Sequence, residues 1–207
     1  MGGKLIWFTY ATLLILIVAM LLAPTGWLNK AAEHEHAMSI RTYSAESMEI
    51  IDGRANRWYD ALLVNTGIEK GLYDYVNPTA RRDAGKWDLD SRGFTEYMAG
   101  RVEAAMLLAF MMLRRISSII SWSPFLLLIA VPAAIDGYLM WRIKKHGYQW
   151  VSPTLHRYAW RAKAIIVFAV VAALFTPLPI PPELLPITFS VFALALGLSI
   201  SNMPKRY

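Results

Sequence analysis

The chain has 207 residues, no cysteine and a formal net charge of +6, and 56% of its residues are hydrophobic. Soluble domains are usually about 45–50% apolar, and the apolar residues here gather in long runs, which indicates a bilayer protein. The absence of cysteine excludes disulfides and thiolate metal sites. The positive charge is concentrated in one short segment and the tails, whereas residues 24–103 carry ten Lys/Arg against thirteen Asp/Glu. We therefore expect no direct contact with nucleic acid.

The first apolar run covers residues 5–23, directly after Lys4. At about 1.5 Å per residue, a helix of this length nearly spans a hydrocarbon core of roughly 30 Å. A cleaved signal peptide is the alternative, but its apolar region is usually only about 7–15 residues long and is followed by a small-residue cleavage site. We therefore predict that residues 1–23 form an uncleaved transmembrane anchor.

Residues 24–118 are predicted to form an elongated helical domain outside the cytoplasm. Apolar residues recur at helical spacing over residues 26–74, and we expect a bend at Gly53 and a break at Gly67 or Gly71. The Asn77-Pro78 pair is a turn signal, and the polar residues 81–93 predict a loop. A second helix is expected to begin near Thr95.

The second helix contains an apolar stretch that ends at a pair of arginines. Residues 106–113 are apolar, and Arg114 and Arg115 follow directly. Arginine at the centre of a bilayer costs several kcal/mol even on lenient insertion scales. We therefore predict a membrane-surface helix over residues 104–118, with a re-entrant element as the open alternative and a kink at Ser123-Pro124 where the chain enters the next span.

Three further spans are expected in the second half. Residues 119–141 form transmembrane helix 2, and residues 164–200 form a hairpin of helices 3 and 4, joined by a connector with four prolines in seven positions, 177–183. Residues 142–163 make a basic loop, and 201–207 a tail. Because short basic loops face the cytoplasm, we predict an all-α, multi-pass protein of the bacterial inner membrane with four transmembrane helices and both termini cytoplasmic.

The loop of residues 142–163 is the main candidate for a docking surface. It holds six of the 21 Lys/Arg residues and no acid, with aromatic residues interleaved. Interfacial anchoring on anionic lipid explains such a loop, and docking of an acidic partner surface is the sharper alternative. The predicted docking residues are Arg142, Lys144, Lys145, Arg157, Arg161 and Lys163.

Two acidic features are candidates for other sites. Asp136 is the one acid within the predicted spans, five positions before Trp141. An ion pair with Arg142, Arg157 or Arg161 explains it better than a proton relay. In Glu-His-Glu-His, residues 33–36, the two histidines lie two positions apart, and on a helix they would not converge on one ion. We expect a solvated helix face there and no metal site.

No nucleophile arrangement, phosphate-binding loop or carboxylate pair is evident, so the sequence predicts no enzyme and no cofactor. Several motifs, however, resemble a known family: DGYLMWRI at residues 136–143, SPTLHRYAWRAK at 152–163, RWYDAL at 57–62, and the C-terminal MPKRY. Together they resemble the integrating conjugative element membrane proteins. Trp160 stands where that family commonly has histidine, which weakens any role for an imidazole there.

The resemblance implies a four-span protein without assigned enzymatic activity in a bacterial conjugation (type IV secretion) apparatus. Similar proteins are linked to the type IV coupling ATPase, so the predicted function is a scaffold beside that motor and other conjugation subunits; a homo-oligomer is left open. One alternative is a small ion-coupled transporter or channel that uses Asp136. The other is an exclusion or envelope factor acting in the recipient cell.

Overall fold

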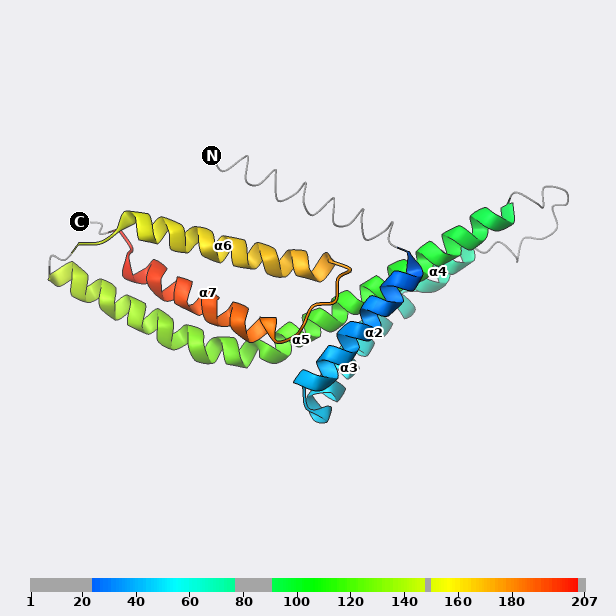
Figure 1. Ribbon diagram of the computed structural model, residues 1–207, viewed down its shortest axis with the longest axis horizontal. Coiled ribbons are helices and arrows are strands. Elements are labelled where there is room, and N and C mark those ends of the chain that lie inside the picture. Colours follow the sequence, from blue (N-terminus) through cyan, green and yellow to red (C-terminus); the bar gives the residue numbers. More distant parts are fainter. Residues whose placement is uncertain (1–23, 77–90, 148–149, 205–207) are drawn as a thin grey trace. The chain divides into compact units, whose positions relative to one another are not determined.

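The computed structural model describes residues 24–76, 91–147 and 150–204, and all its elements in these ranges are helices (Figure 1). The predicted first span, residues 1–23, lies outside the described residues, as do Asn77-Pro78 and most of the polar segment 81–93. The chain divides into two compact units. Unit 1 takes residues 1–118 and 174–181, and unit 2 takes residues 119–173 and 182–207.

Unit 1 begins with a helical hairpin. Helix α2, Thr25–Thr42, ends at an extended Tyr43, and α3, Ala45–Tyr59, begins after Ser44. The Ser44 side chain caps α3 by accepting a hydrogen bond from the backbone N–H of Ser47 at 3.2 Å, which satisfies one of the donors left free at a helix start. Gly53 lies inside α3, and the turn between the two helices falls at the serine cap instead. A bend of the helix at Gly53 stays a prediction.

After α3 the helix widens into a π-helical turn, η1, Asp60–Val64, and α4 follows at Ile68–Val76. Gly67 separates the two with φ 74°, a left-handed conformation that favours glycine, so the break predicted at this residue is confirmed. Burial raises the pKa of the Tyr59 phenol, and the nearby carboxylate of Glu69, to which its side chain is hydrogen-bonded, raises it further. This contact ties the end of α3 to the start of α4.

Helix α5, Ser91–His146, is a single helix of 56 residues that contributes to both units. It runs through Pro124, where the sequence predicted only an entry kink between two elements. Proline removes the hydrogen bond to the carbonyl four residues earlier, here Ile120. The Ser123 hydroxyl donates to the Ile120 carbonyl at 2.7 Å. This hydrogen bond replaces the one that proline removes, and the helix continues.

The core of unit 1 lies where α5 packs on α2 and α4. Leu28 forms a buried cluster with Ala104 and Leu108, and Val76 forms another with Val102 and Met106. The apolar character of residues 106–113 is thus accounted for by helix–helix packing. The position of this segment relative to a bilayer stays a prediction.

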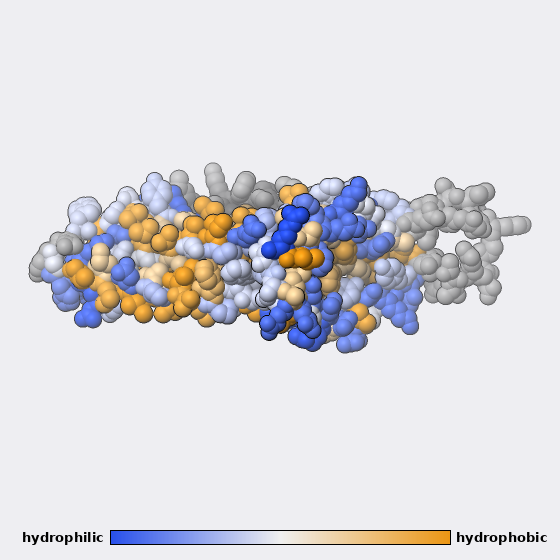
Figure 2. Space-filling view, turned by 60° about the horizontal axis from the view of Figure 1, so that its bottom comes forward, coloured by the Kyte–Doolittle hydropathy of each residue, from blue (hydrophilic) through white to orange (hydrophobic). Residues whose placement is uncertain are grey.

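Unit 2 contains residues 119–146 of α5, all but the last two residues of α6, Pro153–Phe175, and the whole of α7, Leu184–Ser201. In the described part of the chain, three helices are long and apolar enough to cross a membrane: α5, α6 and α7. Many large apolar side chains are exposed on these helices, and Figure 2 shows hydrophobic patches among more polar residues on one face. Helices α5 and α7 approach each other closely at Gly137, where an added Cβ would lie 2.6 Å from the Gly197 carbonyl oxygen. Small residues permit such backbone contact between apolar helices.

Candidate functional site

The first candidate site is the basic end of unit 2, built around the C-terminus of α7. The last carbonyls of a helix lack intrahelical donors and carry the negative end of the helix dipole. Three basic side chains from α5 and α6 reach this helix end, two at backbone carbonyls and one at a side-chain hydroxyl. Lys144 Nζ donates to the Ser201 carbonyl at 3.3 Å, His156 Nδ1 to the Ser199 carbonyl at 2.7 Å, and Lys163 Nζ to the Ser199 hydroxyl at 3.1 Å. Asn202, only 4% exposed, completes the cap through its side-chain amide, which donates to the Leu198 carbonyl at 3.0 Å.

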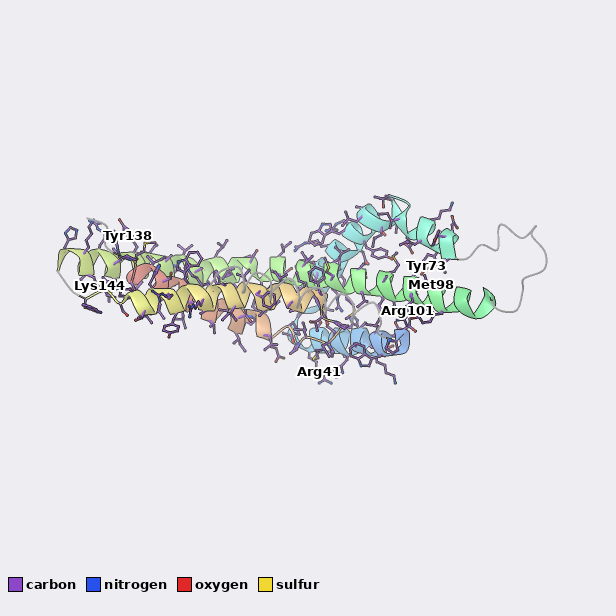
Figure 3. All side chains as sticks on the ribbon, turned by 90° about the horizontal axis from the view of Figure 1, so that it is seen from above. Arg41, Tyr73, Met98, Arg101, Tyr138 and Lys144 are labelled. Carbon is purple, nitrogen blue, oxygen red and sulfur yellow. The ribbon has the colours of Figure 1, made fainter. Side chains whose placement is uncertain are left out.

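The six predicted docking residues therefore fall into two groups. Lys144 and Lys163 are partly buried and donate hydrogen bonds to the end of α7. Figure 3 shows Lys144 near the end of α5, six residues after Tyr138. The other four are exposed to solvent, and the ammonium of one, Lys145, lies over the Trp141 ring at 5.3 Å. We call these four the exposed basic set: Arg142, Lys145, Arg157 and Arg161.

Most of the basic segment is helical. Helix α5 continues through His146 and α6 begins at Pro153, so the described non-helical residues of this segment are Gly147 and residues 150–152. Arg157 and Arg161 lie one turn apart on α6, as their spacing predicted. Asp136 is exposed on α5, and within the described residues it forms no ion pair with the arginines proposed as its partners. A role for Asp136 stays a prediction.

The second candidate site lies in unit 1 and is centred on a buried ion pair that the sequence did not predict. The guanidinium of Arg115, on α5, donates from Nε and Nη2 to the Glu35 carboxylate on α2 at 2.5–3.2 Å. Both residues are less than 10% exposed. The remaining donors of Arg115 reach the α6–α7 connector, at the carbonyls of Thr176 (2.5 Å) and Leu178 (2.7 Å). We call this arrangement the Arg115 clasp.

The neighbouring arginine makes a second set of polar contacts. Arg114 Nε donates to Asp52 Oδ1 on α3 at 2.7 Å, and Arg114 Nη2 donates to His36 Nδ1 on α2 at 2.7 Å. Because arginine only donates hydrogen bonds, His36 Nδ1 accepts here and the imidazole carries its proton on Nε2. The two arginines thus join α5 to α2 and α3.

The prediction of a solvated face for residues 33–36 is wrong in part. Glu33 and His34 are exposed, but Glu35 is buried in the clasp and His36 contacts Arg114. No cluster of three or more potential metal ligands occurs in the part of the chain that the structure describes. Two arginines at the end of an apolar run need acidic partners when they are buried, but the same pair at a membrane surface needs none, so this signal alone does not identify Glu35.

Beside the Arg114 contacts lies a pocket of about 390 Å³ between α2, α3 and α5. Its wall is largely apolar, and charged side chains stand around it. The lining residues are Ala32, Glu33, Glu35, His36, Asp52, Asn56, Leu107, Phe110, Met111 and Arg114.

Residues 19–207 match the family described as IncC plasmid conjugative DNA transfer protein DtrJ-like. The chain belongs to this DtrJ-like family. No curated protein and no solved structure matches the chain. As a DtrJ-like protein the chain takes part in conjugative DNA transfer, which confirms the conjugation-related resemblance drawn from its motifs. The more specific assignment to the integrating conjugative element membrane proteins is not confirmed.

Membership in the DtrJ-like family also indicates that the chain works with other conjugation proteins. The match covers both candidate sites, since the clasp, the pocket and the basic end of unit 2 all lie within residues 19–207.

Proposed function

We propose that this DtrJ-like protein is a non-enzymatic subunit of the bacterial inner membrane that holds a cytoplasmic component of the DNA-transfer apparatus beside the bilayer. The observation that carries the proposal is the exposed basic set. Four cations without an acidic neighbour on their segment stand at the end of unit 2, while Lys144 and Lys163 fix the helix end beneath them. A surface of this kind fits an acidic partner. By the motif resemblance, the coupling ATPase is the first partner to test.

The bilayer-length helices support the membrane part of the proposal. Trp141 follows Trp122 by 19 positions on α5, about 28 Å of helix at about 1.5 Å per residue, close to the roughly 30 Å hydrocarbon core. Tryptophan is enriched at both membrane interfaces. With the bilayer between these residues, the exposed basic set lies at the headgroup level on the cytoplasmic side, where it also meets anionic lipid. Both termini are then cytoplasmic, as a fourth span in residues 1–23 requires.

The proposal predicts that reversing the charge of Arg157 and Arg161 abolishes DNA transfer. The double variant R157E/R161E is expected to insert in the membrane at wild-type level, to lose co-purification of the coupling ATPase from mild-detergent membranes, and to lower transfer frequency by orders of magnitude. The double variant R157K/R161K keeps the charge and should keep most of the transfer. R41E, at an exposed arginine of unit 1, is the matched single-reversal control and should behave as wild type.

Wild-type transfer by R157E/R161E, in a mating assay where the inserted protein is quantified, would contradict the docking proposal. Asp136→Asn separates the proposal from ion-coupled transport. Scaffolding predicts unchanged transfer for this variant, and transport predicts its loss together with intact partner binding.

A further inference from the structure

We propose that the pocket between α2, α3 and α5 of unit 1 receives the Lys or Arg side chain of a basic segment in another protein. The pocket lies in a different unit from the exposed basic set, so this inference is independent of the proposed function and the two can fail separately. The proposed occupant has two features that the pocket can recognise, a cationic end and a hydrocarbon stem.

The charges around the pocket select a cation. Three carboxylates line it, those of Glu33, Glu35 and Asp52, and one guanidinium, that of Arg114. Arg115 neutralises Glu35 from behind the wall and Arg114 neutralises Asp52. Glu33 is exposed at the rim and has no ion-pair partner among the described residues. The lining therefore keeps an uncompensated negative charge, and a cation at the rim would pair with it.

The apolar wall selects the stem. Leu107, Phe110 and Met111 project from α5 into the pocket, and the long methylene chains of lysine and arginine pack well on such surfaces while their heads stay at a polar rim. The Phe110 ring is held edge-on by Tyr59, with centroids 5.9 Å apart, and an aromatic face also attracts a cation. A volume of about 390 Å³ lies within the range of roughly 300–1,000 Å³ typical of ligand pockets.

Other occupants fit less well. An anion would face three carboxylates and meet a single guanidinium that already donates to Asp52 and His36. A purely apolar side chain would fill the wall but would remove water from Glu33 without giving it a partner, and desolvating an unpaired charge is costly. A basic side chain satisfies the wall and the rim together.

The first test uses butylguanidinium as the probe and the full-length protein in detergent, labelled with [methyl-13C]methionine. Met111 lines the pocket and is 5% exposed, so its methyl resonance, assigned with Met111→Leu, reports occupancy. Butylguanidinium is expected to shift it saturably, and butyrate, which has the opposite charge on a similar stem, is expected not to. Glu33→Gln should weaken the apparent affinity roughly two- to fivefold, the size expected for an exposed ion pair. Glu49→Gln, at an exposed carboxylate of α3 outside the pocket, should leave it unchanged.

The second test identifies the natural occupant as a protein segment. A photo-crosslinking amino acid at Asn56, exposed at the rim, is activated in cells during conjugation, and the crosslinked peptides are sequenced. The proposal expects a segment with Lys or Arg beside the crosslink, whose replacement by Gln removes the crosslink. It is overturned by crosslinks only to lipid, only to segments without basic residues, or by equal Met111 shifts from butylguanidinium and butyrate. An absence of any Met111 shift with either probe overturns it equally.

Discussion

The Arg115 clasp gives the sharpest test of how unit 1 is held together. In Arg115→Met the guanidinium is lost while the apolar stem is largely kept. Glu35 is then left as a buried carboxylate without a cation, and the carbonyls of Thr176 and Leu178 lose their donors. Breaking one side of a buried ion pair costs about 3–5 kcal/mol, more than a typical single substitution. At roughly 2–4 °C per kcal/mol for a chain of this size, the midpoint of thermal unfolding should fall by about 6–20 °C.

The double variant separates ion pairing from packing. Glu35→Met/Arg115→Met removes the buried carboxylate as well, so the remaining losses are the guanidinium donor of the Thr176 and Leu178 carbonyls and the carboxylate acceptor of the Ile180 amide. Replacing a buried pair by apolar residues of similar volume is often nearly neutral, and the double variant should therefore be more stable than the sum of the single losses by about 1–3 kcal/mol. The detergent-solubilised chain is heated in steps, and size-exclusion chromatography after each step measures the fraction still folded, which gives the midpoint of thermal unfolding for each variant. Arg57→Met, at an exposed arginine of α3, is the control and should change stability by less than about 0.5 kcal/mol.

Two results would refute this reasoning. One is a loss of less than about 1 kcal/mol in Arg115→Met, which would mean that the guanidinium is not buried against Glu35. The other is additivity of the two single losses in the double variant, since independent sites add and residues in one network do not.

Two further predictions follow from unit 2 and the helix ends. Gly137→Ala should lower the midpoint of thermal unfolding, because its Cβ would lie 2.6 Å from the Gly197 carbonyl oxygen. Gly71→Ala has open space around its Cβ and should raise stability by about 0.5–1 kcal/mol. Equal effects of the two substitutions in a thermal scan would contradict the close contact. Lys144→Met should lower stability by up to about 1 kcal/mol while Arg161→Met leaves stability unchanged and lowers transfer. The reverse pattern in paired stability and mating assays would undo the division of the basic residues.

The bilayer-length helices of unit 2 were predictable because apolar length alone indicates a helix of this size. The connector of prolines separated α6 from α7, and the spacing of Arg157 and Arg161 placed them on one helix. The continuity of α5 was not predictable from the same pattern. Proline is a helix breaker in water, and only the Ser123 hydroxyl on the freed Ile120 carbonyl shows how the helix passes Pro124. In apolar surroundings, neighbouring polar side chains can replace the backbone hydrogen bond that proline removes. The apolar pattern of the sequence does not show which side chain reaches the freed carbonyl.

The turn between α2 and α3 was missed for a different reason. Gly53 drew attention as a possible bend, but a glycine inside a helix costs only about 1 kcal/mol relative to alanine and does not by itself end the helix. Ser44 favours the start of a new helix at this point, because its hydroxyl accepts a hydrogen bond from the Ser47 amide in the first turn of α3. A capping residue ahead of an acidic first turn, here with Glu46, is therefore better evidence of a boundary than a glycine.

The arginine pair shows where a sequence argument has to end. A buried or membrane-embedded arginine costs several kcal/mol unless it is paired, so Arg114 and Arg115 had to find either water and headgroups or carboxylates. The cost is similar in both cases and does not choose between them. Glu35 lies 80 positions away from Arg115, in a cluster whose four polar residues look equivalent along the chain. Only the crossing of α2 and α5 turns Glu35 inward and leaves Glu33 at the rim of the pocket, so one carboxylate stabilises the fold while the other is available to a ligand.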